Sequence, residues 1–335
     1  MEFFHKVPSF DFMGRRRAAV IVSMVLNVAT IGLLLVHGLN LGIDFTGGTL
    51  VEVSYAESAD IGEVRTALSK AGIERANVQH FGTTRDVLIR LQVEEGKTSA
   101  EQSDKIMQAL RAPFSELLFE RGTIGGAQQC TSTTAAKPFD CQVQMRRVEF
   151  VGPQVGSELV EQGVLAIVFA LVGIMVYVAF RFEWRFAVGA VVATVHDVLL
   201  TVGFFSITRF EFSLVELAAV LTIMGYSIND TVVVFDRIRE NFRKLRKEGT
   251  LVVMNNAINE TLSRTVMTGV TTLLVVGALF FLGGDTLRGF AAALIFGILV
   301  GTYSSVFVAS PTVLMLGLTR EDMLPPKKEG ADATP

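Results

Sequence analysis

Two aspartates stand inside long apolar runs of this sequence. Asp197 follows His196 in the run 187–207, and Asp230 lies toward the end of the run 213–235. A carboxylate at the centre of a membrane-spanning helix costs about 2.5–3.5 kcal/mol on insertion scales. Such residues therefore usually face the interior of a helix bundle and mark ion or proton pathways. The pattern predicts that these aspartates bind and release protons.

The neighbours of Asp230 fit that chemistry. Ser227 shares a helical face with Asp230, because residues three apart lie one above the other, and Asn229 precedes it directly. Arg264 opens the next apolar run, which returns through the membrane, so it reaches a comparable depth. A nearby arginine favours an ionised carboxylate and burial disfavours it, so a site balanced between the two can load and release a proton. We expect these groups to form a proton-coupling site with Asp197 and His196.

A purely structural interpretation of the same residues stays open. Asp230 or Asp197 could make an interhelical hydrogen bond or ion pair that only holds the bundle together. Arg264 could equally lie at the membrane surface with its charged end in water.

Other chemistry has little support in the composition. The four histidines show no metal-ligand spacing, and the sequence contains neither a Gly-x-Ser-x-Gly element nor a phosphate-binding loop. We expect no cofactor other than protons. The net charge of −3 gives no support for a nucleic-acid partner. Cys130 and Cys141 are either two free thiols or, if their segment lies outside the cytoplasm, a disulfide.

Six apolar runs must position these residues, and each has the length of a bilayer crossing, about 17–25 residues. They cover 18–37, 162–180, 187–207, 213–235, 265–282 and 289–316. The last run is longer than a crossing needs, and we expect it to tilt or bend before Pro311. Gly297, Gly301, Ser304 and Ser305 in this run suit close helix packing, and we assign them no chemistry.

Basic residues predict the orientation, since Lys and Arg concentrate in cytoplasmic loops. They lie before the first run, after the second and after the fourth, namely Arg15, Arg16, Arg17, Arg181, Arg185, Arg237, Arg239, Arg243, Lys244, Arg246 and Lys247. The opposite short loops hold only Arg209 and Arg288. We therefore expect both termini in the cytoplasm. The predicted cytoplasmic segments are 1–17, the connector 236–264, with an amphipathic helix over 251–264, and the tail 317–335.

The segment 38–161 is then a folded domain outside the cytoplasm. Alternating apolar residues predict strands, and amphipathic stretches predict helices. The expected strands are 49–55, 76–81, 86–93 and 141–151, and the expected helices are 60–71 and 99–119, the latter broken or kinked at Pro113. This order, βαββαβ, is the ferredoxin-like α+β pattern. The Gly-, Thr- and Ser-rich stretch 121–140 is expected to be a loop insertion. The fold class is thus an α-helical membrane protein of six transmembrane helices, with one ferredoxin-like domain between the first and second.

Several motifs resemble those of the SecD/SecF family of translocase subunits, and specifically its SecF branch. They occur in the family's order along nearly the whole chain, and the longest match covers seventeen contiguous residues. The motifs are GIDFTGG at 42–48, VEFVGPQVG at 148–156, HD at 196–197, GYSINDTVVVFDRIREN at 225–241 and SRT at 263–265.

The resemblance implies a member of the resistance-nodulation-division superfamily in the bacterial inner membrane. It implies that Asp230 matches the family's essential intramembrane aspartate and Arg264 its functional arginine. Family members pair with SecD, associate with the SecYEG channel and use the proton-motive force to promote translocation and release of preproteins. YajC is a further candidate partner, and the surrounding lipid is expected to contact the spans. The stretch 121–140 is longer than this family usually carries.

Two other functions remain to be weighed. A proton-coupled small-molecule exporter of the same superfamily would need a homologous partner, because such proteins carry two six-span halves and two large outer domains. An intramembrane aspartyl protease could use Asp197 and Asp230 as a dyad that shares a proton. The sequence has no Gly-x-Gly-Asp element around either aspartate.

Overall fold

The structure is a computed structural model, and it describes residues 8–73, 76–91, 99–120, 127–132 and 137–319. The chain divides into two compact units, one formed by residues 1–40 with 165–335 and the other by residues 41–164. Each is described by itself. Parts of four predicted segments lie outside the described residues, namely 1–7 of the N-terminal segment, 92–93 of the strand 86–93, 121–126 with 133–136 of the insertion, and 320–335 of the tail.

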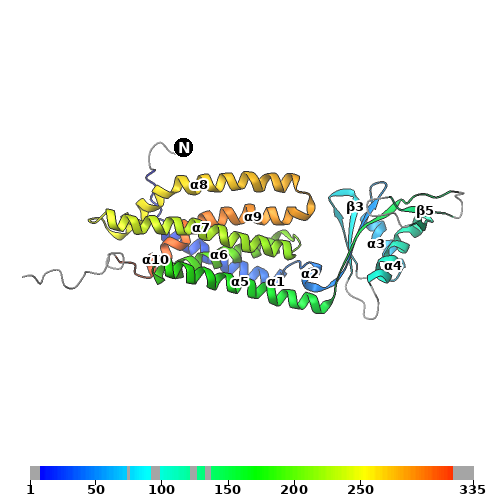
Figure 1. Cartoon of the computed structure of the whole chain (residues 1–335), viewed down its shortest axis with the longest axis horizontal. Coiled ribbons are helices and arrows are strands. Elements are labelled where there is room, and N and C mark those ends of the chain that lie inside the picture. Colours follow the sequence, from blue (N-terminus) through cyan, green and yellow to red (C-terminus); the bar gives the residue numbers. More distant parts are fainter. Residues whose placement is uncertain (1–7, 74–75, 92–98, 121–126, 133–136, 320–335) are drawn as a thin grey trace, which may run out of the picture. The chain divides into compact units, whose positions relative to one another are not determined.

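Six helices of the described chain are long and apolar enough to cross a membrane, as the sequence predicts. Figure 1 shows them running alongside one another in the helical unit. Their bounds are α1 Arg16–His37, α5 Pro153–Arg181, α6 Trp184–Thr208, α7 Leu214–Lys244, α8 Thr250–Leu282, and a last span made of α9 Asp285–Ser304, a π-helical turn η2 Ser305–Ala309 and α10 Ser310–Met315.

Most of these helices extend beyond the apolar runs that predicted them. Helix α5 begins at Pro153 rather than at 162, with a proline at the first helical position, where no N–H is needed. Helix α7 continues to Lys244 and α8 starts at Thr250, so the predicted connector 236–264 is mostly helix. Only the apolar part of a helix must match the hydrocarbon, whereas its backbone hydrogen bonds continue into water. Hydropathy therefore marks the lipid-facing length of the helix but misses its ends.

The last span is interrupted just before Pro311. The π-helical turn Ser305–Ala309 separates α9 from α10. Proline has no N–H to continue the helical ladder, and π-turns commonly occur where a ladder is disturbed. The hydroxyl of Ser310 donates to the carbonyl oxygen of Ser305 at 3.1 Å, which gives that carbonyl a partner within the turn.

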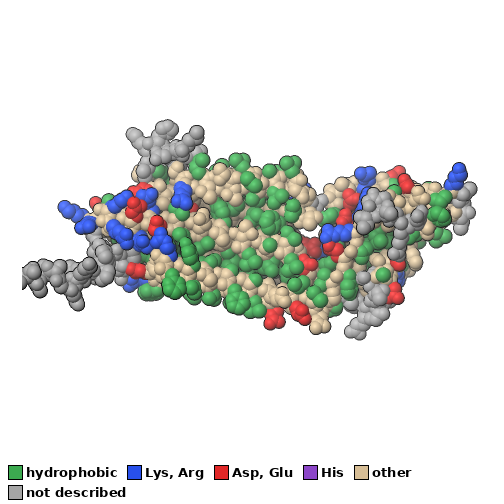
Figure 2. Space-filling model, in the orientation of Figure 1, with side chains coloured by type: hydrophobic (Ala, Val, Ile, Leu, Met, Phe, Trp, Pro, Cys, Tyr) green, Lys and Arg blue, Asp and Glu red, His purple; other side chains and the backbone are tan. Residues whose placement is uncertain are grey.

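The interior of the helical unit lies between α6, α7 and the last span. In the most apolar stretch of each span, 61% of the residues are buried in α6 and in the last span, but only 6% in α1 and 11% in α5. The rings of Phe186, in the first turn of α6, and Phe235 on α7 pack edge to face with centroids 4.9 Å apart in this core. Figure 2 shows many apolar side chains on the visible face of this unit, between its ends, as expected for contact with lipid.

A segment before α1 is fastened to α8. The side-chain oxygen of Asn255 accepts the backbone N–H groups of Phe12 and Met13, at 2.9 and 3.2 Å. The amide of Asn259 accepts from the backbone N–H of Phe10 and donates to its carbonyl oxygen. Met13 is buried in the same core. We call residues 8–14 the N-terminal strap.

The second unit contains a four-stranded antiparallel sheet in the order β2-β3-β1-β7. Apolar residues of the sheet pack against one face of α3 and of α4 to form its core. The elements are α2 Ile43–Thr46, β1 Gly48–Tyr55, α3 Ile61–Lys70, β2 Asn77–Phe81, β3 Thr83–Leu91, α4 Ser99–Arg111, a 3₁₀ turn Ala112–Phe114, β4 Leu117–Glu120, β5 Gln129–Thr131, β6 Phe139–Asp140 and β7 Val143–Val151.

Two expectations for this unit are wrong. The helix predicted over 99–119 does break near Pro113, as expected, but it ends at Arg111 and is followed by β4 rather than by a further helical segment. The stretch 121–140, predicted as a loop, carries β5 and β6; β5 pairs with β4 and β6 pairs with β5, in a second sheet of order β4-β5-β6. Cys130 and Cys141 form a disulfide beside it.

The glycines that follow α2 are required by close packing. Gly47 and Gly48 both have positive φ, at +68° and +143°. A Cβ at Gly48 would lie 2.5 Å from the carbonyl oxygen of Leu91, and one at Gly47 would lie 2.9 Å from the Cα of Pro153. A Cβ at Gly156 would lie 3.0 Å from the amide nitrogen of Gly47. The sequence motifs at 42–48 and 148–156 therefore pack against each other.

This contact predicts the effect of adding one methyl group. Gly48→Ala should destabilise the sheet unit by roughly 1–3 kcal/mol, because alanine disfavours that φ and its Cβ meets a backbone carbonyl. Limited proteolysis of the full chain in increasing urea should show earlier cleavage within 41–164. Gly152→Ala is the control, since its Cβ would meet open space. Equal stability of the two variants would contradict the prediction.

Candidate functional site

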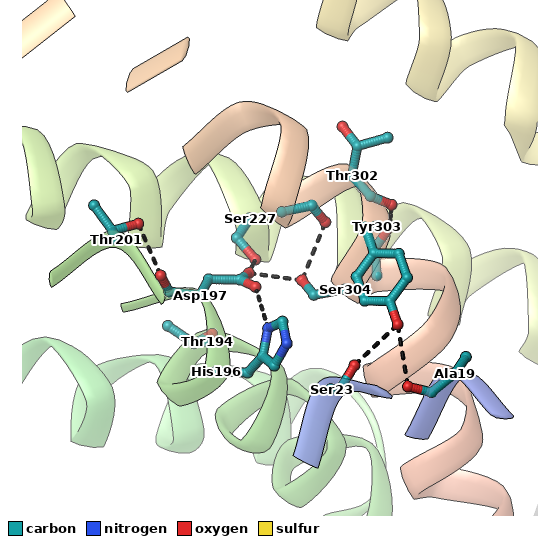
Figure 3. A network of polar contacts seen from close by, with 12 residues as sticks. Ala19, Ser23, Thr194, His196, Asp197, Thr201, Ser227, Thr302, Tyr303 and Ser304 are labelled. Carbon is teal, nitrogen blue, oxygen red and sulfur yellow. Dashed lines mark hydrogen bonds and ion pairs between the residues drawn. The ribbon is translucent and has the colours of Figure 1, made fainter. Parts of the chain in front are cut away.

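Asp197 lies fully buried on α6 at the centre of a polar network (Figure 3). Its Oδ2 accepts hydrogen bonds from the hydroxyls of Ser227 on α7, at 2.5 Å, and Ser304 on α9, at 2.6 Å. Its Oδ1 lies 2.9 Å from Nδ1 of His196. These contacts join three helices at a single carboxyl group.

His196 extends the network toward α1. Its other ring nitrogen, Nε2, is buried and has no hydrogen-bond partner among the residues that the structure describes. The ring faces that of Tyr303 with centroids 6.2 Å apart. The hydroxyl of Tyr303 lies 3.0 Å from that of Ser23 and donates to the carbonyl oxygen of Ala19 at 3.1 Å, both on α1. A buried polar atom without a partner is rare in folded proteins and often marks a functional position.

Asp230 on α7 is held in the same manner. The hydroxyl of Thr265 on α8 donates to its Oδ1 at 2.5 Å, and that of Ser305 donates to its Oδ2 at 2.6 Å. Asp230 is 7% exposed, and both hydroxyl residues are buried. The carboxyl group thus joins α7 to α8 and to the last span.

Adjacent serines connect the two aspartates. Ser304 ends α9 and contacts Asp197, whereas Ser305 opens the π-helical turn and contacts Asp230. On α7, Ser227 lies one turn before Asp230 but donates to Asp197. Asp197 is therefore bonded to α7, which carries Asp230, and both acids are bonded to the last span.

The ligands of these carboxyl groups allow two protonation states. A hydroxyl can donate to an ionised carboxylate, and it can accept from a protonated carboxylic acid, since it carries one donor and two acceptor sites. A site built from hydroxyls therefore keeps its hydrogen bonds when the acid gains or loses a proton. A lysine or arginine fixed in the same place would favour the ionised form alone.

The structure does not bring every predicted residue into this network. Arg264 is exposed, and in the described chain no ion pair joins it to Asp230. Thr265, the next residue, faces the acid instead, because neighbours on a helix point about 100° apart. Asn229 is exposed as well. Ser227, expected beside Asp230, binds Asp197.

Sequence reasoning missed the hydroxyl donors of the last span and of α8. The sequence predicts only close packing for Ser304 and Ser305 and assigns no role to Thr265. The signal that could have identified them is the pair of hydroxyls in the middle of an apolar run, because two buried acids need donors from facing helices. Gly297 and Gly301 do approach α7 closely, against Ile223 and Ser227.

The geometry gives no support to a protease dyad. No hydrogen bond joins Asp197 to Asp230 in the described chain, and each binds its own serine. A shared proton requires the two carboxyl groups to contact each other. The described group with metal-ligand geometry, which consists of Glu116, Cys130 and Cys141, has both sulfurs in the disulfide.

Comparison with known proteins identifies relatives along the whole chain. Residues 131–319 match the family described as protein export membrane protein SecD/SecF, C-terminal, and residues 32–59 match the SecD/SecF GG motif. The protein translocase subunit SecF of Pseudomonas aeruginosa is 43% identical over 98% of this chain and 99% of its own length. That of Vibrio alginolyticus is 45% identical over 97% and 96%.

A solved structure has the same fold. The crystal structure of SecDF, a translocon-associated membrane protein from Thermus thermophilus, superposes with a TM-score of 0.76 at 36% identity. The match covers 93% of this chain and 39% of that one, so the present chain spans well under half of the longer protein.

The Asp197 contacts predict an energetic coupling. Asp197→Asn replaces the acceptor carboxyl group by an amide, and Ser304→Ala removes the donor of the same buried hydrogen bond, so their effects should not add. We expect a coupling of about 0.5–3 kcal/mol in the free energy of unfolding, measured in detergent by a double-mutant cycle. Thr312→Val is the control partner for Asp197→Asn, since Thr312 donates within the last span, to Val308. An additive Asp197–Ser304 cycle would contradict the assigned hydrogen bond.

Proposed function

The chain belongs to the SecD/SecF family of protein export membrane proteins, and on that premise we propose that it uses the proton-motive force to promote preprotein translocation and release. It is a multi-pass inner membrane protein with a role in the Sec pathway. The observation that carries the proton-coupled part of the proposal is the buried carboxyl group of Asp230, which hydroxyls from two other spans hold in the bundle interior.

Proton binding at Asp230 would change the contacts between spans. The ionised carboxylate accepts from Thr265 and Ser305, which holds α8 and the last span against α7. Protonation weakens both charge-assisted bonds, each worth about 1.5–3 kcal/mol. One charge crossing the full membrane potential supplies about 2.3 kcal/mol per 100 mV, a comparable amount. A proton gradient is therefore strong enough to bias the packing between two arrangements.

We assign Asp197 and His196 to the same proton-coupling site. The support is their shared connection to Asp230 through Ser304 and Ser305, together with the partnerless Nε2 of His196. Arg264 precedes Thr265 on α8 and is exposed, so its contribution in this arrangement is a charge near the site rather than a bond to the acid. Among the described contacts, none joins the Asn229 side chain to either aspartate.

We further propose that both termini lie in the cytoplasm and that residues 41–164 lie outside it. Figure 2 shows Lys and Arg side chains gathered at the end of the helical unit where α7 ends and α8 begins, as the positive-inside rule expects for a cytoplasmic end. We propose a ferredoxin-like topology for the outer unit. It is supported by the sheet order β2-β3-β1-β7 with α3 and α4 in the two crossover connections.

The partner proposed for this chain is a SecD subunit, with the SecYEG channel and YajC as further members of the assembly. The solved relative is named SecDF and is a longer chain, of which this protein matches 39%. Helices α1 and α5 expose most of their apolar side chains, which suits lipid and neighbouring spans. Co-purification with SecD would support the translocase role, whereas a homo-oligomer would favour the exporter.

The role of Asp230 predicts the loss of proton coupling on its neutralisation. In membrane vesicles that carry the assembled complex, Asp230→Asn should reduce translocation-linked proton flux to the level of vesicles lacking the protein. Asp236→Asn is the matched control, because Asp236 lies on the same helix but forms an exposed ion pair with Arg181. Unchanged flux in Asp230→Asn would remove Asp230 from the path.

The proposed orientation predicts where the disulfide forms. Disulfides persist outside the cytoplasm and are rare within it. A thiol-reactive polyethylene glycol reagent should therefore label Cys130 and Cys141 of cellular protein only after reduction. Met315→Cys, at the exposed end of α10, is the control and should react without reductant once the cells are permeabilised. Free thiols at both native positions before reduction would place residues 41–164 in a reducing compartment.

A further inference from the structure

We propose that the hydroxyls of Ser304 and Ser305 each alternate between two hydrogen-bond acceptors, and we call this pair the switch. The change of acceptor transmits the protonation state of the two buried aspartates to the π-helical turn of the last span. The inference rests on the proposed proton coupling at Asp230 and concerns how that event is passed on. Ser304 and Ser305 act here as positioning residues, since the protons bind to the carboxyl groups.

Each of the two serine hydroxyls lies within reach of two acceptors. The Oγ of Ser304 is 2.6 Å from Oδ2 of Asp197 and 3.1 Å from the carbonyl oxygen of Gly301. The Oγ of Ser305 is 2.6 Å from Oδ2 of Asp230 and 3.0 Å from the carbonyl oxygen of Thr302. A hydroxyl has one proton, so it can donate to only one of the two at a time.

The protonation state of the acid decides which acceptor is used. When Asp230 is ionised, the Ser305 hydroxyl donates to it, because a charged acceptor is the stronger one. When Asp230 gains a proton on Oδ2, its O–H donates to Oγ of Ser305, whose own proton then turns to the Thr302 carbonyl. No proton leaves the serine, and the net gain is the single proton on the carboxyl group. Ser304 responds to Asp197 in the same way, toward Gly301.

The second acceptor belongs to the helix backbone at a sensitive place. A serine that donates to a carbonyl one turn earlier competes with the backbone ladder and commonly bends a helix. Gly301 and Thr302 lie in the last turn of α9, directly before the π-helical turn Ser305–Ala309. The carbonyl of Ser305 is already bonded to the Ser310 hydroxyl. Donation toward the backbone therefore acts where the ladder is already interrupted.

Two other hydroxyls provide an internal contrast. Thr265 donates to Asp230, and Ser227 donates to Asp197, each at 2.5 Å, and neither has a second acceptor among the described contacts. They can hold a carboxyl group but cannot redirect their proton to the backbone in this arrangement. The two-acceptor geometry is therefore a property of the serine pair and not of every hydroxyl in the network.

Few charged groups surround the switch. On α6 it faces Asp197 and His196, and on α7 it faces Asp230 with the phenol of Tyr226 nearby. From α8, the charged residue beside the site is Arg264, which directly precedes Thr265 and is exposed. In α9 the titratable neighbour is Tyr303, whose hydroxyl is bonded to α1. Of these groups, the two aspartates are the ones that contact the serine hydroxyls directly.

The turn also has a route to the cytoplasmic end of the unit. The ring of Phe307 in the π-helical turn packs edge to face with that of Phe12, with centroids 5.8 Å apart. Phe12 belongs to the N-terminal strap, which Asn255 fastens to α8. A change in the geometry of the π-helical turn would therefore shift the N-terminal strap and α10.

The test measures helix geometry and protonation separately in the full complex. Spin labels at Met315→Cys on α10 and Leu251→Cys on α8 report the distance between these ends, and both positions are exposed. The native cysteines are bonded to each other and take no label. The infrared band of protonated carboxylic acid, compared with and without Asp230→Asn, reports the proton on Asp230.

We expect the label distance to change between alkaline and acidic pH, and this change to be lost in Ser305→Ala while the Asp230 infrared band still appears. Thr265→Val removes the other hydroxyl from the same acid and should keep the distance change. Ser305→Thr retains a hydroxyl and should keep it too. The part of the distance change that is lost in Asp197→Asn is the part that depends on Asp197. Ser304→Ala should lose the same part, and adding Ser304→Ala to Asp197→Asn should cause no further loss.

An undiminished distance change in Ser305→Ala would overturn the proposal, as would an equal loss in Thr265→Val, because the effect would then belong to any hydroxyl. Failure of the proposed function looks different. In that case Asp230→Asn keeps normal proton flux, whatever the serine variants do.

Discussion

Hydrocarbon offers no hydrogen-bond partner to a polar group, and this constraint governs the helical unit. Two carboxyl groups are placed on neighbouring spans, α6 and α7, and each must find donors within the protein. The donors are hydroxyls from α7, α8 and the last span. The two acids thereby decide which helices meet and at what depth. The small residues Gly297 and Gly301 let the last span approach closely enough for those bonds to form.

The choice of hydroxyls as partners has a functional consequence. A carboxylate paired with a fixed cation would remain ionised, whereas one surrounded by serine and threonine can be occupied by a proton without losing its contacts. The carboxyl groups and their hydroxyl partners belong to packed helices, so a change in the charge of an aspartate alters the packing between those helices. Membership in a family of protein export membrane proteins is consistent with the proposal that this coupling serves preprotein translocation.

Much of the fold follows from the sequence, and the failures have physical causes. The six spans, the order of the main strands and the burial of Val51 and Val53 agree with hydropathy and alternation. Helix ends were misplaced because helical hydrogen bonding continues beyond the apolar run. The strands β5 and β6 were missed because such short elements, in a Gly-, Thr- and Ser-rich stretch, carry little periodic signal.

The sequence by itself determined which side chains are costly in a membrane, and hence that Asp197 and Asp230 are central. It could not determine their partners. Ser227 is one helical turn from Asp230 yet binds Asp197, and Thr265 rather than Arg264 contacts Asp230. Those choices depend on how each helix is rotated about its axis and on the π-helical turn at Ser305–Ala309. Rotation is set by packing against neighbouring helices far away in the chain, which local spacing does not encode.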